Sequence, residues 1–159
     1  MVDYPPSVDA FEVVPGERIG PFRIAMTRDE AAAEAEAAGV PLERTMVRAL
    51  PGGETWIVDQ QVFVYFDQVG RANAIEAALR DGKPVTWLGM PLDSAAREVV
   101  AAFDAIAEAD RTDREYPAST CYPQIGLCLW MDAKPGAPLG GVFESVLVRR
   151  PESTDIAAR

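Results

Sequence analysis

The stretch "RIAMTRDEAAAEAEAAGV", residues 23–40, decides the interpretation of the fold because it holds a complete helix with signals at both ends. Thr27 and Glu30 match a capping box, in which the hydroxyl accepts from a first-turn amide and the carboxylate reaches back to the N–H of the cap. Gly39 and then Pro41 are typical of a helix C-terminus. The stretch therefore predicts one bounded helix.

This helix is predicted over residues 28–38, and its interior is nearly all alanine and glutamate. Its alanines favour close packing on a sheet, with Glu34 and Glu36 turned outward. Apolar segments with β character follow, separated by the glycine-containing turns "PGG" and "DQVG". They are "RTMVRAL" from Arg44, "ETWIV" from Glu54, "QVFVYFD" from Gln61 and "RANAIEAAL" from Arg71. The first half is thus predicted to be one helix and an antiparallel meander.

A second stretch, "WLGMPLDSAAREVVAAF" at residues 87–103, resembles the first. It predicts a helix from Asp93 or Ser94 to Ala107, with an apolar stripe on one side. The residues of the stripe are Val99, Val100, Phe103 and Ile106. The polar connection "ADRTDREYPAST", the predicted strand "IGLCLWMD" from Ile125 and the predicted strand "VFESVLVRR" from Val142 complete the half.

The two halves also agree in spacing. Met26 and Asp67, which closes "VFVYFD", are 41 positions apart, and Met90 and Asp132, which closes "LCLWMD", are 42 apart. We interpret this as an internal duplication with an offset of 64, the separation of Met26 from Met90. Coincidence between two ordinary helix-and-hairpin units is the alternative.

The predicted fold class is α+β, with two tandem helix-plus-antiparallel-β-meander units and both helices on one face of the sheet. The predicted divisions are an N-terminal segment at residues 1–18, a first unit at 19–82, a second unit at 83–150 and a frayed tail at 151–159. Together they are expected to form one compact globular domain, which suits a chain of 159 residues.

Charge limits the classes of partner. The chain has 25 acidic and 15 basic residues, a net charge of −10, and this disfavours contact with nucleic acids or anionic membranes. A basic protein is the partner that the charge favours. The N-terminal sequence has no readable signal peptide and no apolar run approaches a membrane span, so a cytoplasmic location is expected.

Catalytic chemistry is poorly supported by the composition, and we predict a non-enzyme with no cofactor and no metal. Histidine is absent, and Asp67 and Asp132 both stand at turns, where a solvated aspartate is the ordinary case. Cys121 and Cys128 match no zinc spacing. Reduced structural thiols are expected for this pair, with a disulfide as the alternative if the protein is exported.

The residues resemble a known family. "AMTRDEAAAEAEAAGVP", then Trp56, then "VFVYFDQVGRANAIE" is similar to the SmpA/OmlA (BamE) lipoprotein domain, with its Gly-Met-Thr helix start. Ala25 stands where that pattern prefers glycine, and Pro91 replaces the capping threonine in the second unit. A tandem of such units is similar to the architecture of the β-lactamase inhibitor proteins. The resemblance implies an exposed sheet that binds another protein.

Alternation along the strands indicates which side chains this sheet would expose. It places Val62, Val64 and Phe66 on one face, and Phe63 and Tyr65 on the other. Aligned through the closing aspartates, Leu127, Leu129 and Met131 share the first face, and Cys128 and Trp130 the second.

Large amphipathic aromatics with charged neighbours are typical of protein-binding hot spots. Glu54, among other acidic residues, is expected beside this face, and Trp56 is expected to join it. The predicted partner-binding residues are Trp56, Phe63, Tyr65, Glu76, Trp130 and Glu144. In the alternative interpretation, the N-terminal segment or the loop at residues 110–123 covers these aromatics.

The leading functional prediction is a non-catalytic immunity or inhibitor protein that occludes a basic toxin or enzyme. An envelope assembly or structural module of the SmpA/OmlA type is one alternative. A small ligand-binding domain with a pocket between the two units is another.

Overall fold

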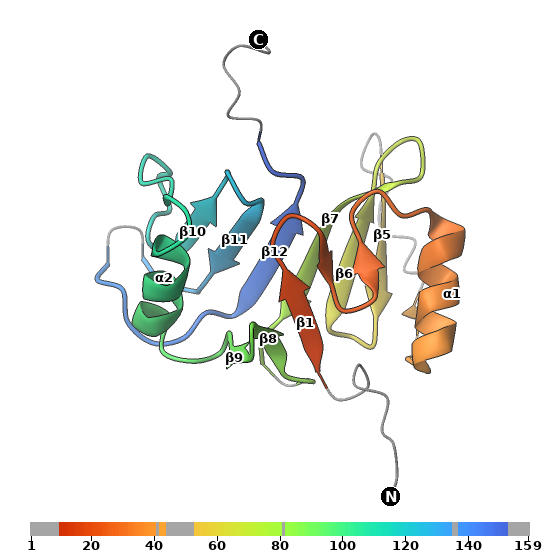
Figure 1. The fold of residues 1–159 in the computed structure, drawn as a ribbon, viewed down its shortest axis with the longest axis horizontal. Helices are drawn as coiled ribbons and strands as arrows, with labels where there is room; N and C mark the ends of the chain where they lie inside the picture. Colours follow the sequence, from red (N-terminus) through yellow and green to blue (C-terminus); the bar gives the residue numbers. More distant parts are fainter. Residues whose placement is uncertain (1–9, 41, 44–52, 81, 135–136, 153–159) are drawn as a thin grey trace, which may run out of the picture.

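The computed structural model describes residues 10–40, 42–43, 53–80, 82–134 and 137–152, and these form an α+β structure with two helices and two sheets (Figure 1). The helices are α1 (Arg28–Ala38) and α2 (Ala96–Asp104). The α+β class predicted from the sequence is confirmed.

The larger sheet has seven strands, all antiparallel, in the order β10-β11-β12-β7-β6-β5-β4. They are β4 (Leu42–Glu43), β5 (Glu54–Val58), β6 (Val62–Phe66), β7 (Ala72–Ala78), β10 (Ser119–Tyr122), β11 (Leu127–Trp130) and β12 (Ser145–Arg149). One meander runs from β5 to β7 and another from β10 to β12. The pairing of β7 with β12 joins the two meanders at the centre.

The smaller sheet has five strands in the order β3-β2-β1-β8-β9, and its β1–β8 pair is parallel. They are β1 (Phe11–Val14), β2 (Arg18–Ile19), β3 (Phe22–Arg23), β8 (Val85–Trp87) and β9 (Met90–Pro91). The sequence did not predict this sheet, because its strands are two to four residues long. β1 belongs to the predicted N-terminal segment, yet it pairs with β8 of the second half.

Three elements cover one face of the large sheet: α1 at one end, α2 at the other, and the small sheet between them (Figure 1). Arg28 of α1 lies over the ring of Phe66, 5.7 Å from its centroid. Phe103 of α2 stacks on Trp87 at 4.2 Å and lies 5.6 Å from Tyr122 of β10. The buried core therefore fills the space between this covering layer and one face of the large sheet.

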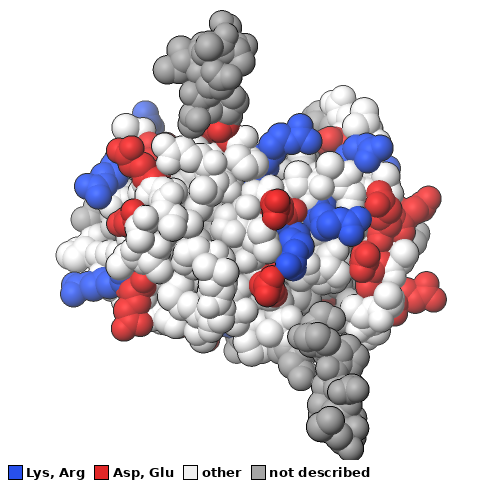
Figure 2. Space-filling view, in the orientation of Figure 1, with Lys and Arg blue, Asp and Glu red and all other residues white. Residues whose placement is uncertain are grey.

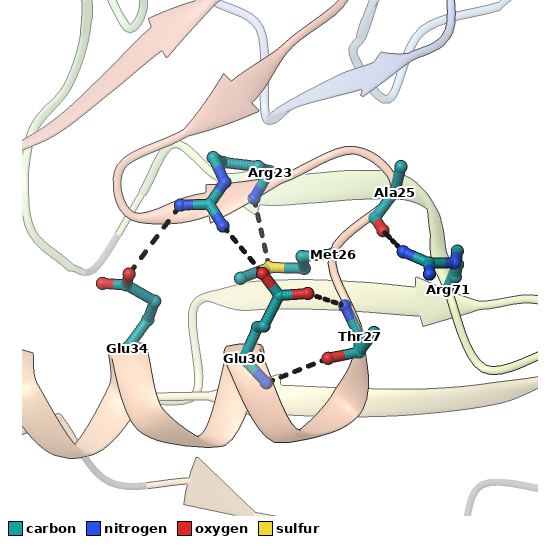
Figure 3. A network of polar contacts seen from close by, with 7 residues as sticks. All are labelled: Arg23, Ala25, Met26, Thr27, Glu30, Glu34 and Arg71. Atoms are coloured by element: carbon teal, nitrogen blue, oxygen red, sulfur yellow. Dashed lines mark hydrogen bonds and ion pairs between the residues drawn. The ribbon is translucent and has the colours of Figure 1, made fainter.

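The first helix forms as predicted, with its capping box in place (Figure 3). The amide of Glu30 donates to Thr27 Oγ1 at 3.2 Å, and the amide of Thr27 donates to Glu30 Oε1 at 3.0 Å. Gly39 ends the helix with φ 66°, a left-handed conformation that suits glycine. Ala31 and Ala35 are the buried helix residues, so small side chains bring α1 close to the sheet.

The second helix is shorter than predicted. It begins at Ala96 because Ala95 is extended and bridges Val142, and it has no side-chain cap. It ends at Asp104, so Ile106 lies beyond it and is 56% exposed. Including Ile106 in the apolar stripe was wrong, whereas the other three stripe residues are buried.

Some predicted strands also need correction. The segment predicted as a polar connection contains the start of β10, in which Thr120 turns inward as a buried residue. The predicted strand "RTMVRAL" from Arg44 lies outside the described residues. Of the predicted tail, Pro151 and Glu152 are exposed, and the amide of Glu152 donates to the carbonyl of Pro123 at 2.9 Å.

The segments that precede the two helices share one pattern of turns and strand pairing. In each, a two-residue turn joins two short strands, a second turn follows, and one bridged residue precedes the helix. Corresponding residues are 68 positions apart. The pairs are Arg18 with Arg23 and Ile19 with Phe22 in β2–β3, and Thr86 with Pro91 and Trp87 with Met90 in β8–β9. The bridged residues are Thr27, which faces Arg71, and Ala95, which faces Val142.

We expect Thr27→Ala to lower the free energy of unfolding by about 1 kcal/mol, because it removes the hydroxyl that caps α1. Ser94→Ala is the matched control, since the side chain of Ser94 makes no hydrogen bond in the described part of the chain. Urea unfolding of both variants measures the difference. Equal losses would contradict a specific role for the capping box.

Hydrogen bonds from the backbone amide and then the hydroxyl of Thr27 hold the pKa of Glu30 below its ordinary 4.5. A carboxyl with a lowered folded pKa stabilises the protein above its unfolded pKa, and that stability is lost as the pH falls through the folded value. We therefore expect the stability difference between wild type and Glu30→Gln to be greatest above pH 4.5 and to shrink in more acidic buffer. Urea unfolding at several pH values, with Glu36→Gln as control, tests this. A difference that grew on acidification would contradict it.

Candidate binding face of the large sheet

The two faces of the large sheet differ sharply in burial. Val62, Val64 and Phe66 of β6 are buried, while Phe63 and Tyr65 are half-buried. In β11, Leu127 and Leu129 are buried, Cys128 is half-buried and Trp130 is exposed. The alternation predicted for both strands is therefore confirmed. Among the described residues, every strand side chain on the second face from β5 to β12 is half-buried or exposed, and we call this the open face.

Strand register arranges the open face in three rows that run across the sheet. The middle row consists of Ile57, Phe63, Glu76, Leu147, Cys128 and Cys121. One flanking row consists of Thr55, Tyr65, Ala74 and Arg149, and the other of Ala78, Ser145, Trp130 and Ser119. The rows combine aromatic and aliphatic side chains with few charges, and Glu76 is the only carboxylate in them.

Tyr65 and Glu76 form the central polar contact of this face. The phenolic O–H of Tyr65 donates to Glu76 Oε1 at 2.7 Å. Burial of the ring, followed by this hydrogen bond and the charge of Glu76, raises the pKa of Tyr65 well above its ordinary value. Tyr65 therefore stays a neutral donor near neutral pH. Glu76 has no ion pair within the described part of the chain, so its carboxylate can accept a cation from outside.

Trp130 is the most exposed aromatic of the open face, at 43%. It lies between Ser145 and Ser119 in one of the two flanking rows. Tyr65 lies in the opposite flanking row. The face thus carries one large amphipathic aromatic on each side of the middle row, and such residues are enriched in binding hot spots.

The placement predicted for Trp56 was wrong. Trp56 is 3% exposed, pairs with Val64 and contacts Phe66 edge-on at 4.9 Å, so it belongs to the covered face. Its indole N–H donates to Glu54 Oε1 at 2.7 Å. Glu54 also pairs with Arg28 of α1 at 2.7 Å, so its carboxylate serves the helix contact and not the open face.

Glu144 stands at the rim. It comes directly before β12, where its carbonyl accepts from Leu79 and its amide donates to Trp130. Its carboxylate lies 3.4 Å from the guanidinium of Arg80. The structure therefore brings Phe63, Tyr65, Glu76 and Trp130 onto one face, sets Glu144 at its edge, and removes Trp56 from it.

The cysteines are bonded to each other. Cys121 of β10 and Cys128 of β11 face each other in register and form a disulfide. The expectation of reduced thiols is thereby corrected, because adjacent strands bring the two side chains to the same face. Strand register is a property of the folded sheet and could not be read from the seven-residue spacing.

Other kinds of site find little support. Asp67 Oδ1 accepts from the amides of Val69 and Arg71, so this carboxylate holds a turn, as the sequence suggested. The described residues contain no group of three or more acidic or cysteine side chains placed to hold a metal ion. Within the same residues, neither helix is long and apolar enough to cross a membrane.

Comparisons with family models, with curated proteins and with solved structures gave no match for this chain. The geometry of the open face is thus the basis for the functional inference. Sequence reasoning missed Ile57 and Leu147, which extend the apolar middle row. Their alternation within "ETWIV" and "SVLVR" is a signal that could have placed them, once each strand's inward residues were known.

We expect Trp56→Ala to lower the free energy of unfolding by about 3–5 kcal/mol, because it leaves a cavity in the core. Trp130→Ala should cost less than about 1 kcal/mol, because its side chain lies at the surface. Urea unfolding of the two variants compares the same chemical change on opposite faces. Similar losses would contradict the assignment of Trp130 to an open face.

Proposed function

We propose that this protein is a non-catalytic protein-binding module that acts as an immunity or inhibitor protein, occluding a basic toxin or enzyme with its open face. One observation carries the proposal: Ile57, Phe63 and Leu147 form an apolar row around the carboxylate of Glu76. Apolar area supplies binding energy, while a partly desolvated carboxylate selects a partner that presents a cation.

The proposed partner is basic. A net charge of −10 speeds association with a cationic protein through long-range attraction. At close range, Glu76 has no ion pair among the described residues, and Tyr65 orients its carboxylate by donating to one oxygen. A lysine or arginine of the partner would form an ion pair with the carboxylate of Glu76.

We also propose that the chain is a tandem duplication, with units near residues 19–82 and 83–150. The matching turns and bridges before α1 and α2 support it, and they favour an offset of 68 over the 64 inferred from the two methionines. On this alignment Thr27 corresponds to Ala95, and Pro91 does not take the place of the cap. The resemblance to tandem units of the SmpA/OmlA type and to the β-lactamase inhibitor proteins is consistent with this arrangement.

A second candidate is an envelope module of the SmpA/OmlA type. The disulfide between Cys121 and Cys128 favours it, because such bonds persist in oxidising compartments. For the inhibitor role we propose the cytoplasmic location that is expected from the sequence. Alkylation of the native protein without reductant separates the two locations, since free thiols indicate the cytoplasm and blocked cysteines an exported protein.

The binding test begins with capture of partners from the native host, followed by affinity measurement with each purified partner. We expect Trp130→Ala and Tyr65→Ala each to weaken binding roughly tenfold to a hundredfold, as hot-spot truncations do. Leu88→Ala is the matched control, because Leu88 is 83% exposed on the β8–β9 turn of the covering layer.

The charge test compares Glu76→Gln with Glu36→Gln, which remove the same charge from the open face and from the outer side of α1. We expect only Glu76→Gln to speed dissociation of the complex, which would weaken the affinity roughly tenfold. A captured protein whose binding is unchanged in Trp130→Ala, Tyr65→Ala and Glu76→Gln would sink the open-face proposal.

A further inference from the structure

A hollow lies on the covering layer, where the turn at residues 24–25 meets one end of the central strands. Two adjoining spaces of about 190 and 500 Å³ open there, and Ile24, Ala25 and Arg150 line both. Arg71 directly precedes β7 and Arg150 directly follows β12, so antiparallel pairing brings them to the same end of the sheet. The arginines lining the hollow are Arg18, Arg23, Arg71 and Arg150.

The hollow is positively charged although the chain is acidic overall. Its lining holds those four arginines against two carboxylates, Glu17 and Asp67. Asp67 is already committed to the amides of its own turn. In Figure 2, basic side chains lie over the small sheet with acidic ones beside them, whereas acidic side chains predominate in the region of α1.

The arginines differ in how far their charge is compensated. Arg18 pairs with Glu12 at 2.7 Å, and Arg23 lies 3.3 Å from Glu30. Arg71 forms no ion pair in the described residues, and neither does Arg150, although the charge of Arg71 helps to lower the pKa of Glu30. Two guanidinium groups without a direct carboxylate contact therefore remain in the hollow, and both carry N–H donors for an oxyanion.

Arg71 is also held in position. Its amide donates to Asp67 Oδ1 at 3.0 Å, and its Nη1 donates to the carbonyl of Ala25 at 2.9 Å (Figure 3). Ala25 has φ 71°, a conformation rare for a residue with a side chain, and its amide is tied to the carbonyl of Ala72. The turn and the guanidinium fix each other, so less side-chain entropy is lost when Arg71 binds an anion.

We propose that this arginine hollow binds the phosphate group of a small molecule. Planar guanidinium groups match the oxygens of a phosphate in paired hydrogen bonds, and two cations without a direct carboxylate contact suit a dianion. The larger space exceeds the volume of a phosphate group, so it has room for the rest of the ligand. This site lies where the covering layer meets the ends of β7 and β12, and none of its lining residues belongs to the three rows of the open face.

Inorganic phosphate is the probe. The isotope-labelled full chain is titrated at pH 7.5 while amide resonances are followed by NMR, with sodium chloride at matched ionic strength as reference. We expect saturable shifts of the amides of Ile24, Ala25 and Asn73. Arg150→Gln should weaken phosphate binding roughly tenfold, because it removes a charge-assisted contact.

Arg111→Gln is the matched control, because Arg111 is an exposed arginine on the connection before β10. It should leave phosphate binding unchanged. Arg71→Gln provides the second variant, and thermal melting verifies that each variant is folded. Shifts that do not saturate, that chloride reproduces, or that Arg150→Gln leaves intact would overturn the site. Acetate binding as tightly as phosphate would overturn the preference for a dianion.

Discussion

The antiparallel pairing of β7 with β12 is the contact on which the rest of the structure depends. Residues Ala74 to Ala78 pair with Ser145 to Arg149, so two separate meanders become one sheet. Without this ladder each meander would have an additional strand edge exposed to solvent, an arrangement that invites aggregation. The same ladder places Glu76 opposite Leu147 at the centre of the open face, and sets Arg71 and Arg150 at the same end of the sheet.

Continuity of the sheet also determines where function can lie. A sheet that buries one face needs a single covering layer, and α1, the small sheet and α2 provide it (Figure 1). The core is thus confined to one side. Side chains such as Phe63 and Trp130 are therefore less constrained by packing in the core. Their size and chemistry can serve recognition, as we propose.

Much of the local structure could be predicted from the sequence because its causes are local. The capping box at Thr27 and the alternation of "VFVYF" each depend on residues a few positions apart. Short strands such as β8 and β9 were missed because their formation depends on pairing with distant segments. The offset of 64 came from aligning Met26 with Met90. The strand pairs that precede the two helices instead give an offset of 68, which is four residues, or about one helical turn, larger.

The candidate site shows the same limit. Which face Trp56 occupies depends on its register against Val64, and register is fixed by the whole sheet. The sequence analysis therefore expected Trp56 on the open face, although it lies with Glu54 on the covered side. The disulfide follows the same logic, since only the β10–β11 register shows that Cys121 and Cys128 face each other.

Charge is distributed between the two sides in a way that net charge conceals. The open face has one carboxylate in its middle row, so most of the chain's negative charge lies elsewhere and acts at long range. Where the covering layer meets the ends of β7 and β12, one hollow holds Arg71 and Arg150, which form no ion pair in the described residues, and the turn at residues 24–25 holds Arg71. Long-range attraction of a basic protein and short-range binding of an anion are therefore compatible in one chain, because the net charge sets the field at a distance, whereas the nearest groups decide binding at contact.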